Sequence, residues 1–508
     1  MPAIITDNLK INNCTNFISS IPTGNYYTFI GLPNSQEYSS DWSTNTPSPI
    51  DNLNYQYSYK DTILGVKKIT ASDIIRVIPK IKWESGLKYD MYRHDYSSYN
   101  NTKISSSSKL YDSKYYVMTQ DYNVYICLYN GISPSNLNGV SSFYEPTNTS
   151  TSPQEENDGY IWKYLYTISP SEILKFDSDN YIPVPNNWAG AVKDSAVSGQ
   201  IEIILIENST AYNIGSELIF NNVPILGDGV NGYARVEFNS DSYPIKVIVT
   251  NKGSGYTFAT LDLNSIVSPI EGTSIFNVII PPDGGHGYDL YKELGAFRAL
   301  VYSRIENSDI TNPDFIEGNQ FARIGIIKNI KSYGSSSNFT QSTGSGIYSI
   351  KLLNQNVSEP LNSNITQQST KASGRLIGKS VVGYGASDVI KYIQPREDYI
   401  FTYTSSGVTK TFDPFYTNPI FTGVTTASSY TYREFNNSVI KIQATSYTID
   451  SNFSGSSLGE VYFGQVFSGG ISKPDINIKS GEILYVENRS PVTRQQNQRE
   501  DVKIVIEF

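Results

Sequence analysis

The sequence predicts a mainly β protein, with a layered β-sandwich core and a few short helices, interrupted by two inserted all-β segments. Composition is the first observation behind this class: the 508 residues include 40 Tyr, and Ser, Asn and Thr are abundant. Tyr, Thr and Ile favour strands, whereas Asn, Ser and Gly favour turns, although A/T-rich codon usage would produce the same bias. The second observation is that short apolar runs recur between turn residues. The third is that several of these runs alternate with a period of two, as half-buried strands do.

Composition also excludes several classes of protein. Lys and Arg number 39 against 48 Asp and Glu, for a net charge of -9 without a basic cluster. We therefore expect neither a nucleic-acid partner nor cationic attachment to a membrane. Cys14 and Cys127 are too few for a disulfide framework, so free thiols in a reducing compartment are expected. The start lacks signal-peptide features and no apolar run approaches ~18 residues, so we expect folding in a cytoplasm.

A core that is interrupted twice organises the chain. The predicted segments are an N-terminal arm over 1–20, core parts over 21–198 and 286–330, a closing hairpin over 480–508, and β insertions over 199–285 and 331–479. Both insertions contain short β runs separated by Gly, Ser and Asn, which are typical turn residues. A length of 508 residues agrees with several domains, at roughly 150 residues for each.

Two helices are expected within the core. Thr70 to Ile78 begins with a capping-box pattern formed by Thr70 and Asp73, and Pro79 would end the helix. Ser169 to Phe176 is predicted to form one or two helical turns. Trp83, shortly after the first of these helices, is expected to be buried.

The strongest predicted strand of the first half runs from Asn157 to Ile168. Tyr160, Trp162, Tyr164 and Tyr166 alternate along one face of it. Such a row is either a stacking platform for sugars or bases, or a sheet face covered by another layer. The covered face is favoured, because Ile161 and other apolar residues also occupy the opposite face.

The closing stretch, Gly481 to Phe508, is predicted to contain two strands joined by a polar loop. Ile483 to Glu487, which includes Tyr485, is apolar on both faces, as in a covered strand. Val502, Ile504, Ile506 and Phe508 share one face of the second strand. Because untethered termini fray, this alternation indicates that the end of the chain docks into a sheet.

The residues that could carry chemistry do not form a recognisable catalytic motif. His94 and His286 are the two histidines, and neither lies beside a nucleophile motif or at a zinc spacing. A calcium-loop start at Asp177 lacks the required Gly and Glu, and Gly378-Lys379-Ser380 lacks the first Gly of a phosphate loop. The acidic cluster of Glu155, Glu156 and Asp158 fits a solvated turn. We expect no enzyme, no cofactor and no metal.

Three stretches together resemble one family. They are Val77-Ile78-Pro79 with Trp83 downstream, the run from Asp158 to Leu165 (DGYIWKYL), and the ending from Gly481 to Phe508 with Glu487-Asn488-Arg489. They are similar to the baseplate wedge protein of T-even-type contractile-tailed bacteriophages known as gene product eight. Supporting matches lie at Ile63 to Val66 and Phe321 to Ile327. The resemblance covers about 21–188, 296–330 and 480–508, and the excess length falls in the two insertions.

The resemblance implies a structural role without catalysis. Members of that family form homodimers of layered β-sheets and join other wedge proteins: the long multidomain one, the ring-forming one and the one that leads to the fibres. A virion protein of the tail baseplate, assembled in the host bacterial cytoplasm and rearranging when the sheath contracts, is therefore expected. The candidate structural or interface residues are Trp83, Tyr160, Trp162, Tyr164, Tyr485, Asn488, Arg489 and Phe508. Arg489 is interpreted either as a turn anchor, which is favoured, or as an interface residue.

Two other functions remain as hypotheses. The first is a carbohydrate-binding or glycan-degrading tail protein that uses the aromatic row as a platform and Glu155 or Asp158 as an acid. The second is a secreted adhesin of stacked β modules. The missing signal peptide and the weak internal echo between Ala211 and Gly255 disfavour the adhesin.

Overall fold

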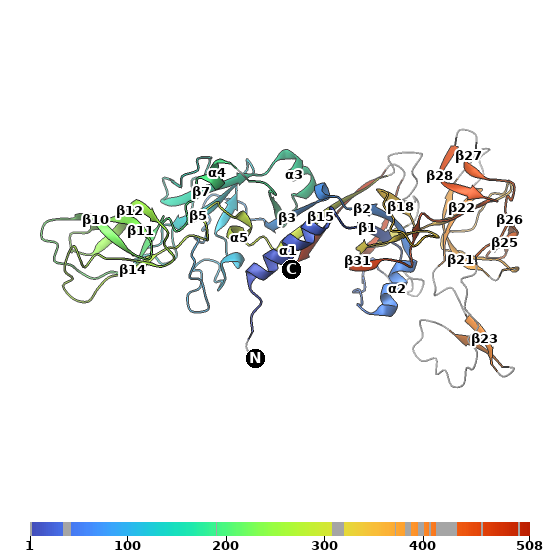
Figure 1. Cartoon of the computed structure of the whole chain (residues 1–508), viewed down its shortest axis with the longest axis horizontal. Coiled ribbons are helices and arrows are strands. Elements are labelled where there is room, and N and C mark those ends of the chain that lie inside the picture. Colours follow the sequence, from blue (N-terminus) through green and yellow to red (C-terminus); the bar gives the residue numbers. More distant parts are fainter. Residues whose placement is uncertain are drawn as a thin grey trace. The chain divides into compact units, whose positions relative to one another are not determined.

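The computed structural model describes residues 3–33, 42–188, 190–306, 320–370, 372–380, 388–394, 401–405, 408–412, 434–458, 461–495 and 498–508. Strands dominate these residues, and the five α-helices among them are short, so the predicted mainly β class is confirmed (Figure 1). Within the described residues, no helix has the length and apolar character needed to cross a membrane.

The chain forms two compact units, each assembled from separate stretches. Unit 1 comprises Met1–Ile18, Ile74–Val301 and Ile504–Phe508, whereas unit 2 comprises Ser19–Asp73 and Tyr302–Lys503. This division differs from the predicted domains. The first core part, 21–198, is divided after Asp73, and the second, 286–330, is divided after Val301.

The central sheet of unit 1 has the strand order β4-β5-β7-β6. Its strands are β4 (Tyr116–Met118), β5 (Asn123–Asn130), β7 (Tyr160–Thr167) and β6 (Gln154–Glu155). Trp162 lies in a large hydrophobic core on this sheet, together with buried Tyr89 and Tyr160. The predicted helical turns are confirmed as α3 (Pro170–Phe176), which has a capping box between Ser169 and Glu172.

A second sheet, with the order β32-β15-β3-β8, includes a strand where the sequence predicted a helix. Its strands are β32 (Arg499–Glu507), β15 (Arg298–Glu306), β3 (Ile74–Pro79) and β8 (Tyr181–Val184). The helix predicted over 70–78 is wrong. Asp73 does bond back to the Thr70 N–H, at 3.1 Å, but the resulting 3₁₀ turn is short (Ala71–Asp73) and β3 follows it directly. The β-branched run that forms β3 suits a pleated strand better than a helix.

The first twenty residues, predicted as an N-terminal arm, are largely helical. They contain α1 (Asp7–Ser20), which buries Ile11 and Cys14. In unit 1 the Thr15 hydroxyl accepts a hydrogen bond of 2.9 Å from buried Arg76, and the Phe17 ring lies 5.5 Å from that of Phe508. Residues 11–17 of α1 therefore pack into unit 1, near the end of the chain (Figure 1).

Residues 199–285 form the inserted domain of unit 1. Four strands make a sheet with the order β12-β11-β10-β13: β12 (Pro244–Ser254), β11 (Val230–Phe238), β10 (Ile219–Gly227) and β13 (Ala259–Leu261). The domain also contains a separate two-stranded sheet, formed by β9 (Ile204–Asn208) and β14 (Ile275–Val278). The domain has a hydrophobic core of its own around Val223, Val236 and Tyr256. The short helices α4 (Ala191–Asp194) and α5 (Leu290–Leu294) flank it in sequence.

Unit 2 contains a five-stranded sheet with the order β18-β2-β1-β16-β31. Its strands are β18 (Thr343–Ser345), β2 (Ile63–Lys68), β1 (Tyr26–Gly31), β16 (Gln320–Lys328) and β31 (Glu482–Thr493), and α2 (Leu53–Asp61) precedes β2. The segment 331–479, predicted as a separate insertion, contributes β18 to this sheet. The remainder of this segment has a hydrophobic core of its own, which includes Ile350, Ile365 and Tyr392.

The rest of 331–479 is also made of strands. A nine-stranded sheet holds β26 (Thr445–Thr448), β25 (Val439–Ile442), β20 (Asn364–Thr366), β21 (Ser373–Ser380), β22 (Val389–Ile393), β19 (Tyr348–Lys351), β29 (Ile471–Ser472), β28 (Val461–Ser468) and β27 (Gly455–Leu458), in that order. Two further pairs join β17 (Lys331–Ser332) to β30 (Ile476–Asn477), and β23 (Phe401–Ser405) to β24 (Val408–Phe412).

Both strands predicted in the closing stretch are present, but they do not pair with each other as a hairpin. β31 pairs with β16 at the edge of the five-stranded sheet, and β32 belongs to the sheet of β15 and β3. Nor is the first of the two covered on both faces, because Leu484 is 44% exposed. Val502 and Ile504 are buried as predicted.

Candidate functional site

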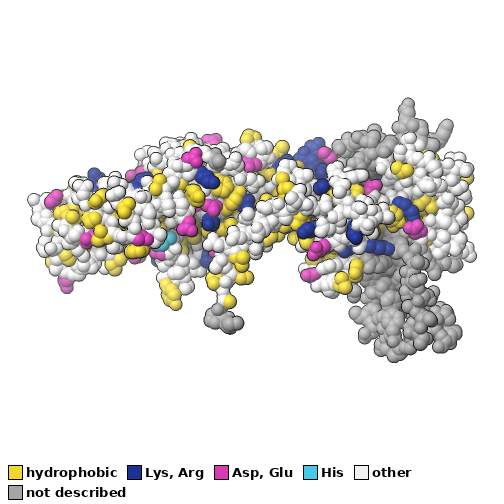
Figure 2. Space-filling model, in the orientation of Figure 1, with side chains coloured by type: hydrophobic (Ala, Val, Ile, Leu, Met, Phe, Trp, Pro, Cys, Tyr) yellow, Lys and Arg dark blue, Asp and Glu magenta, His cyan; other side chains and the backbone are white. Residues whose placement is uncertain are grey.

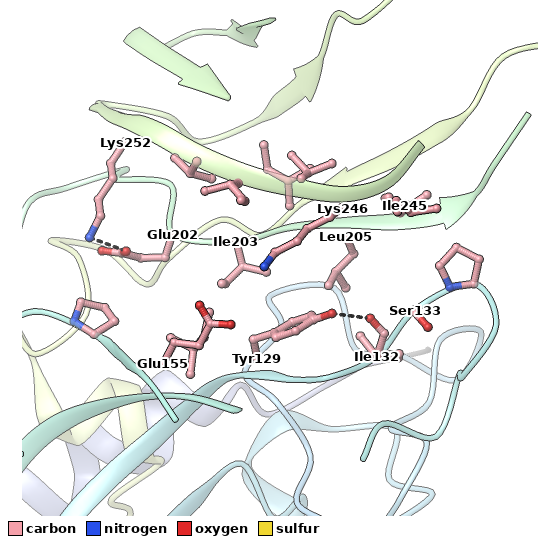
Figure 3. Close-up of a pocket in the computed structure, with 18 residues that line it drawn as sticks. Tyr129, Ile132, Ser133, Glu155, Glu202, Ile203, Leu205, Ile245, Lys246 and Lys252 are labelled. Carbon is pink, nitrogen blue, oxygen red and sulfur yellow. Dashed lines mark hydrogen bonds and ion pairs between the residues drawn. The ribbon is translucent and has the colours of Figure 1, made fainter. Parts of the chain in front are cut away.

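An apolar cavity in unit 1 lies between the central sheet and the inserted domain (Figure 3). One wall, here called the β5–β7–β6 wall, is set by strand register. Ile161 of β7 lies directly opposite Tyr129 of β5 and Glu155 of β6, so all three side chains share one face. Trp162, the next residue of β7, points to the other face and into the hydrophobic core. The tight turn before β7, with Gly159 at φ 84°, brings Glu155 into this register.

The facing wall, here called the β9–β12 wall, comes from the inserted domain. The Ile201 N–H donates to the Lys252 carbonyl at 3.0 Å, and the Ser209 hydroxyl donates to the Pro244 carbonyl at 3.0 Å. These two ties place the segments antiparallel.

In that register Ile203 and Leu205 share a face with Lys246 and Ile248, because side chains alternate along each strand. All four line the cavity. It encloses about 300 Å³ between the two walls.

Charged groups occur at few points around this apolar space. Lys252 forms an ion pair of 2.6 Å with Glu202 at one end. Lys246 reaches inward from the β9–β12 wall and Glu155 from the β5–β7–β6 wall (Figure 3). Within the described part of the chain, neither of these two side chains makes a hydrogen bond or ion pair.

A polar cluster next to the cavity ties the inserted domain to the central sheet's surroundings. Arg93 bridges Asp95, at 2.7 Å, and Glu207 of β9, at 3.0 Å. Asn277 of β14 donates to both carboxylates at 2.9 Å. Burial acts to raise the pKa of Asp95, but the hydrogen bonds and charge of Arg93 outweigh it and lower that pKa from 3.8 to about 2.

The aromatic residues predicted from the sequence are mostly interior. Tyr160 and Trp162 are 0% and 2% exposed, and their rings stack at 5.3 Å. The Tyr160 hydroxyl donates to the Val140 carbonyl. Trp83 is half-buried against the same core, and its Nε1 donates to the Ser142 hydroxyl at 3.1 Å.

The alternation of the aromatic row is broken at Leu165. Tyr125 pairs with Tyr164 while Val124 pairs with Tyr166, so Leu165 is an unpaired bulge residue. Tyr164 lies before the bulge, in continuous register with Trp162, and is half-buried, whereas Leu165 is 1% exposed.

The residues singled out in the closing stretch differ in their contacts and in their exposure to solvent. The Asn488 side chain accepts from Arg323 Nε at 2.9 Å and donates to the Pro47 carbonyl at 3.0 Å. Tyr485 is half-buried and donates to Glu487. Arg489 lies within β31 rather than in a turn, and its exposed side chain is 3.5 Å from Glu487, so the turn-anchor interpretation is wrong. Phe508 packs on Phe17.

The two histidines serve packing and local bonding. His286 is buried, with Nδ1 2.6 Å from Glu293 Oε1 and its ring edge-on to Tyr92. His94 Nδ1 accepts from the Ile280 N–H at 3.2 Å, and burial lowers the pKa of this imidazole. Among the described residues, no group of His, Cys, Asp and Glu is arranged to hold a metal ion.

The cavity was not predicted from the sequence, although two of its signals are visible there. Ile161 is apolar on the face opposite the aromatic row, and Glu155 precedes the turn into the same strand. What the sequence lacks is the register between β9 and β12, which are separated by 35 residues. The arrangement can hold a small apolar body with opposite charges nearby.

The chain matches no family model. A search of the curated proteins likewise gives no match.

Proposed function

We propose that this chain is a structural subunit of a contractile-tail baseplate wedge, which links neighbouring wedge proteins and rearranges when the sheath contracts. The observation that carries the proposal is where the exposed apolar residues lie. Of the 31 large hydrophobic side chains that are exposed among the described residues, 11 fall within residues 218–275 of the inserted domain. Apolar surface gathered in one region marks an interaction site more often than a free surface.

The tip of the β10–β11 hairpin shows this concentration most clearly. Leu226 is the second-last residue of the first strand, Val230 starts the second, and Phe258 lies beside Gly227. These three side chains are 48%, 57% and 65% exposed. Figure 2 shows hydrophobic side chains over the strands that are labelled β10, β11, β12 and β14 in Figure 1. Such a tip offers an apolar anchor to a partner protein.

The stretches that resemble the wedge protein support the particular assembly. In the structure these stretches form strands of the sheets. β3 and β32 belong to one sheet, β7 carries Trp162 in the hydrophobic core, and β31 is an edge strand of the five-stranded sheet. Asp158 accepts bonds from the Phe143 and Tyr144 N–H groups at 2.7 and 3.1 Å. Residues that carry the resemblance thus hold strands and loops in place, which suits a protein whose work is to be a rigid joint.

The glycan-binding alternative loses its platform. Sugar stacking needs an exposed ring face, and Tyr160 and Trp162 are 0% and 2% exposed. We therefore do not propose it as a second function.

Co-expression with the wedge proteins of the same genome tests the proposal. A stable complex should survive size-exclusion chromatography. Phe258→Asp should weaken it, because a charge at the apolar tip would have to be desolvated. The matched control is Leu174→Asp on α3, where the side chain is 70% exposed and away from the tip. Failure to form any complex with these proteins would refute the assignment.

A further inference from the structure

We propose that the cavity between the β5–β7–β6 wall and the β9–β12 wall binds a small apolar zwitterion, of the class of the aliphatic and aromatic α-amino acids. This goes beyond the structural role proposed above and does not depend on it. The inference rests on the size of the cavity, its apolar walls and the two charged side chains that face its interior.

The size and lining fit a ligand no larger than an amino acid or two. A space of about 300 Å³ is at the lower end of small-molecule sites. Ile203 and Leu205 face Tyr129 and Ile161 across it, so both walls offer apolar contact to the body of a ligand. Such sites commonly lie where two structural elements meet and are mostly apolar, with a few convergent polar groups.

The two charged side chains that face the cavity determine which charged groups the ligand carries. Lys246 provides an ammonium from one wall and Glu155 a carboxylate from the other, and both point toward the same space (Figure 3). Two further charged residues of the lining, Lys252 and Glu202, pair with each other at 2.6 Å. A ligand with only a negative end would meet Glu155, and one with only a positive end would meet Lys246. A ligand whose ammonium and carboxylate are adjacent pairs with both.

The test is a ligand-observed NMR titration of the purified full chain with L-phenylalanine and L-leucine at neutral pH. Two blocked analogues accompany them: N-acetyl-L-phenylalanine, which keeps only the carboxylate, and L-phenylalaninamide, which keeps only the ammonium. We expect saturable binding of both amino acids, with weaker binding of each analogue.

Two substitutions assign the ends. Lys246→Met should weaken L-phenylalanine about twofold to fivefold, the range for an exposed ion pair, and leave L-phenylalaninamide unchanged. Glu155→Gln should weaken L-phenylalanine by a similar factor and leave N-acetyl-L-phenylalanine unchanged. Both side chains are exposed, so the variants should fold, and thermal melting checks that they do.

Lys109→Met and Glu217→Gln are the matched controls, because both residues are exposed and neither lines the cavity. They should leave every affinity unchanged. Absence of saturable binding of both amino acids up to about 10 mM, a weak limit even for a ligand of this size, would overturn the proposal. The proposal would also be overturned if neither cavity substitution changed the affinity for L-phenylalanine. It would likewise fail if each substitution weakened the binding of all four compounds equally.

Discussion

Asn488 shows how one side chain can hold together segments that are remote in sequence. It accepts from Arg323 and donates to the Pro47 carbonyl, while Arg323, 0% exposed, also donates to the Leu32 carbonyl and lies over the Tyr59 ring. A buried guanidinium is tolerated only when its donors are satisfied. The adjacent Arg489, by contrast, is exposed. Two neighbouring residues of one motif therefore contribute unequally to the stability of the fold.

We expect Asn488→Ala to lower the free energy of unfolding by about 1–3 kcal/mol, because a buried Arg323 donor loses its acceptor. Urea denaturation measures this change. Arg489→Ala, at the next position on the same strand, is the control and should stay within about 0.5 kcal/mol of the parent. Equal losses for the two variants would show that the bond to Arg323 contributes little.

The sequence predicts single residues well where burial follows from size and alternation. Trp162 and Tyr160 are interior as the favoured interpretation required, and Val502 and Ile504 are buried. A bulge at Leu165 interrupts the alternation between Tyr164 and Tyr166. Bulges depend on the partner strand, so one strand's alternation cannot reveal them.

At the scale of elements, the pattern of a segment predicts its type more reliably than its partner. Alternation identified the strand over 502–508, yet its neighbour is β15, which lies about 200 residues earlier, and not β31. The predicted helix over 70–78 failed because β-branched residues outweighed a capping signal that forms only one turn. The cavity was missed for a related reason, since its walls meet through tertiary register alone.

The polar cluster around Asp95 gives the attachment of β9 and β14 a pH dependence. The pKa of Asp95 is lowered from 3.8 to about 2 in the folded chain. A depressed carboxyl pKa stabilises the fold above the unfolded value, and that stability disappears as pH falls from about 4 to about 2. Because the group is partly exposed, we expect a contribution of only about 1 kcal/mol.

Chemical denaturation between pH 2 and pH 5, an interval of about 3 units that spans both pKa values, tests this expectation. Asp95→Asn should lower stability at the upper end and flatten the decline toward the lower end. Asp121→Asn, at an exposed position, is the control. A variant that declines as steeply as the parent would show that another carboxyl group controls this interval.

At the scale of the whole molecule, each unit is built from stretches that are far apart in sequence. Unit 1 takes its last strand residues from Ile504–Phe508, and unit 2 takes Ser19–Asp73 from before the inserted domain. Composition and periodicity predicted the mainly β class and the interrupted character of the chain. They did not predict where the units divide, because that depends on which strands pair.

Deleting Val502 to Phe508 should produce misfolded protein. The deletion removes buried Val502 and Ile504, each worth about 1.5–3 kcal/mol, and it leaves β15 without its neighbour on that side. Solubility and circular dichroism check the result. Ile504→Ala is the milder variant and should cost about 2–5 kcal/mol, whereas exposed Lys503→Ala should cost little. A soluble truncated chain with unchanged spectra would contradict this role of the strand.

The proposed wedge role also predicts the oligomeric state. Sedimentation of the purified chain at micromolar concentration should show a dimer, as the resemblance implies. If the hairpin tip forms the dimer contact, Leu226→Asp should shift the equilibrium toward monomer. A parent protein that remains strictly monomeric would count against the wedge assignment.

The separation of each unit's parts along the chain bears on how the protein is synthesised. A ribosome makes unit 1 residues 74–301 long before residues 504–508, whose strand closes their sheet. Nascent domains ordinarily fold as they emerge, but here the sheet of β15 stays open on one side until nearly every described residue has been translated. Premature termination anywhere upstream therefore leaves an exposed strand edge, which chaperones and proteases recognise.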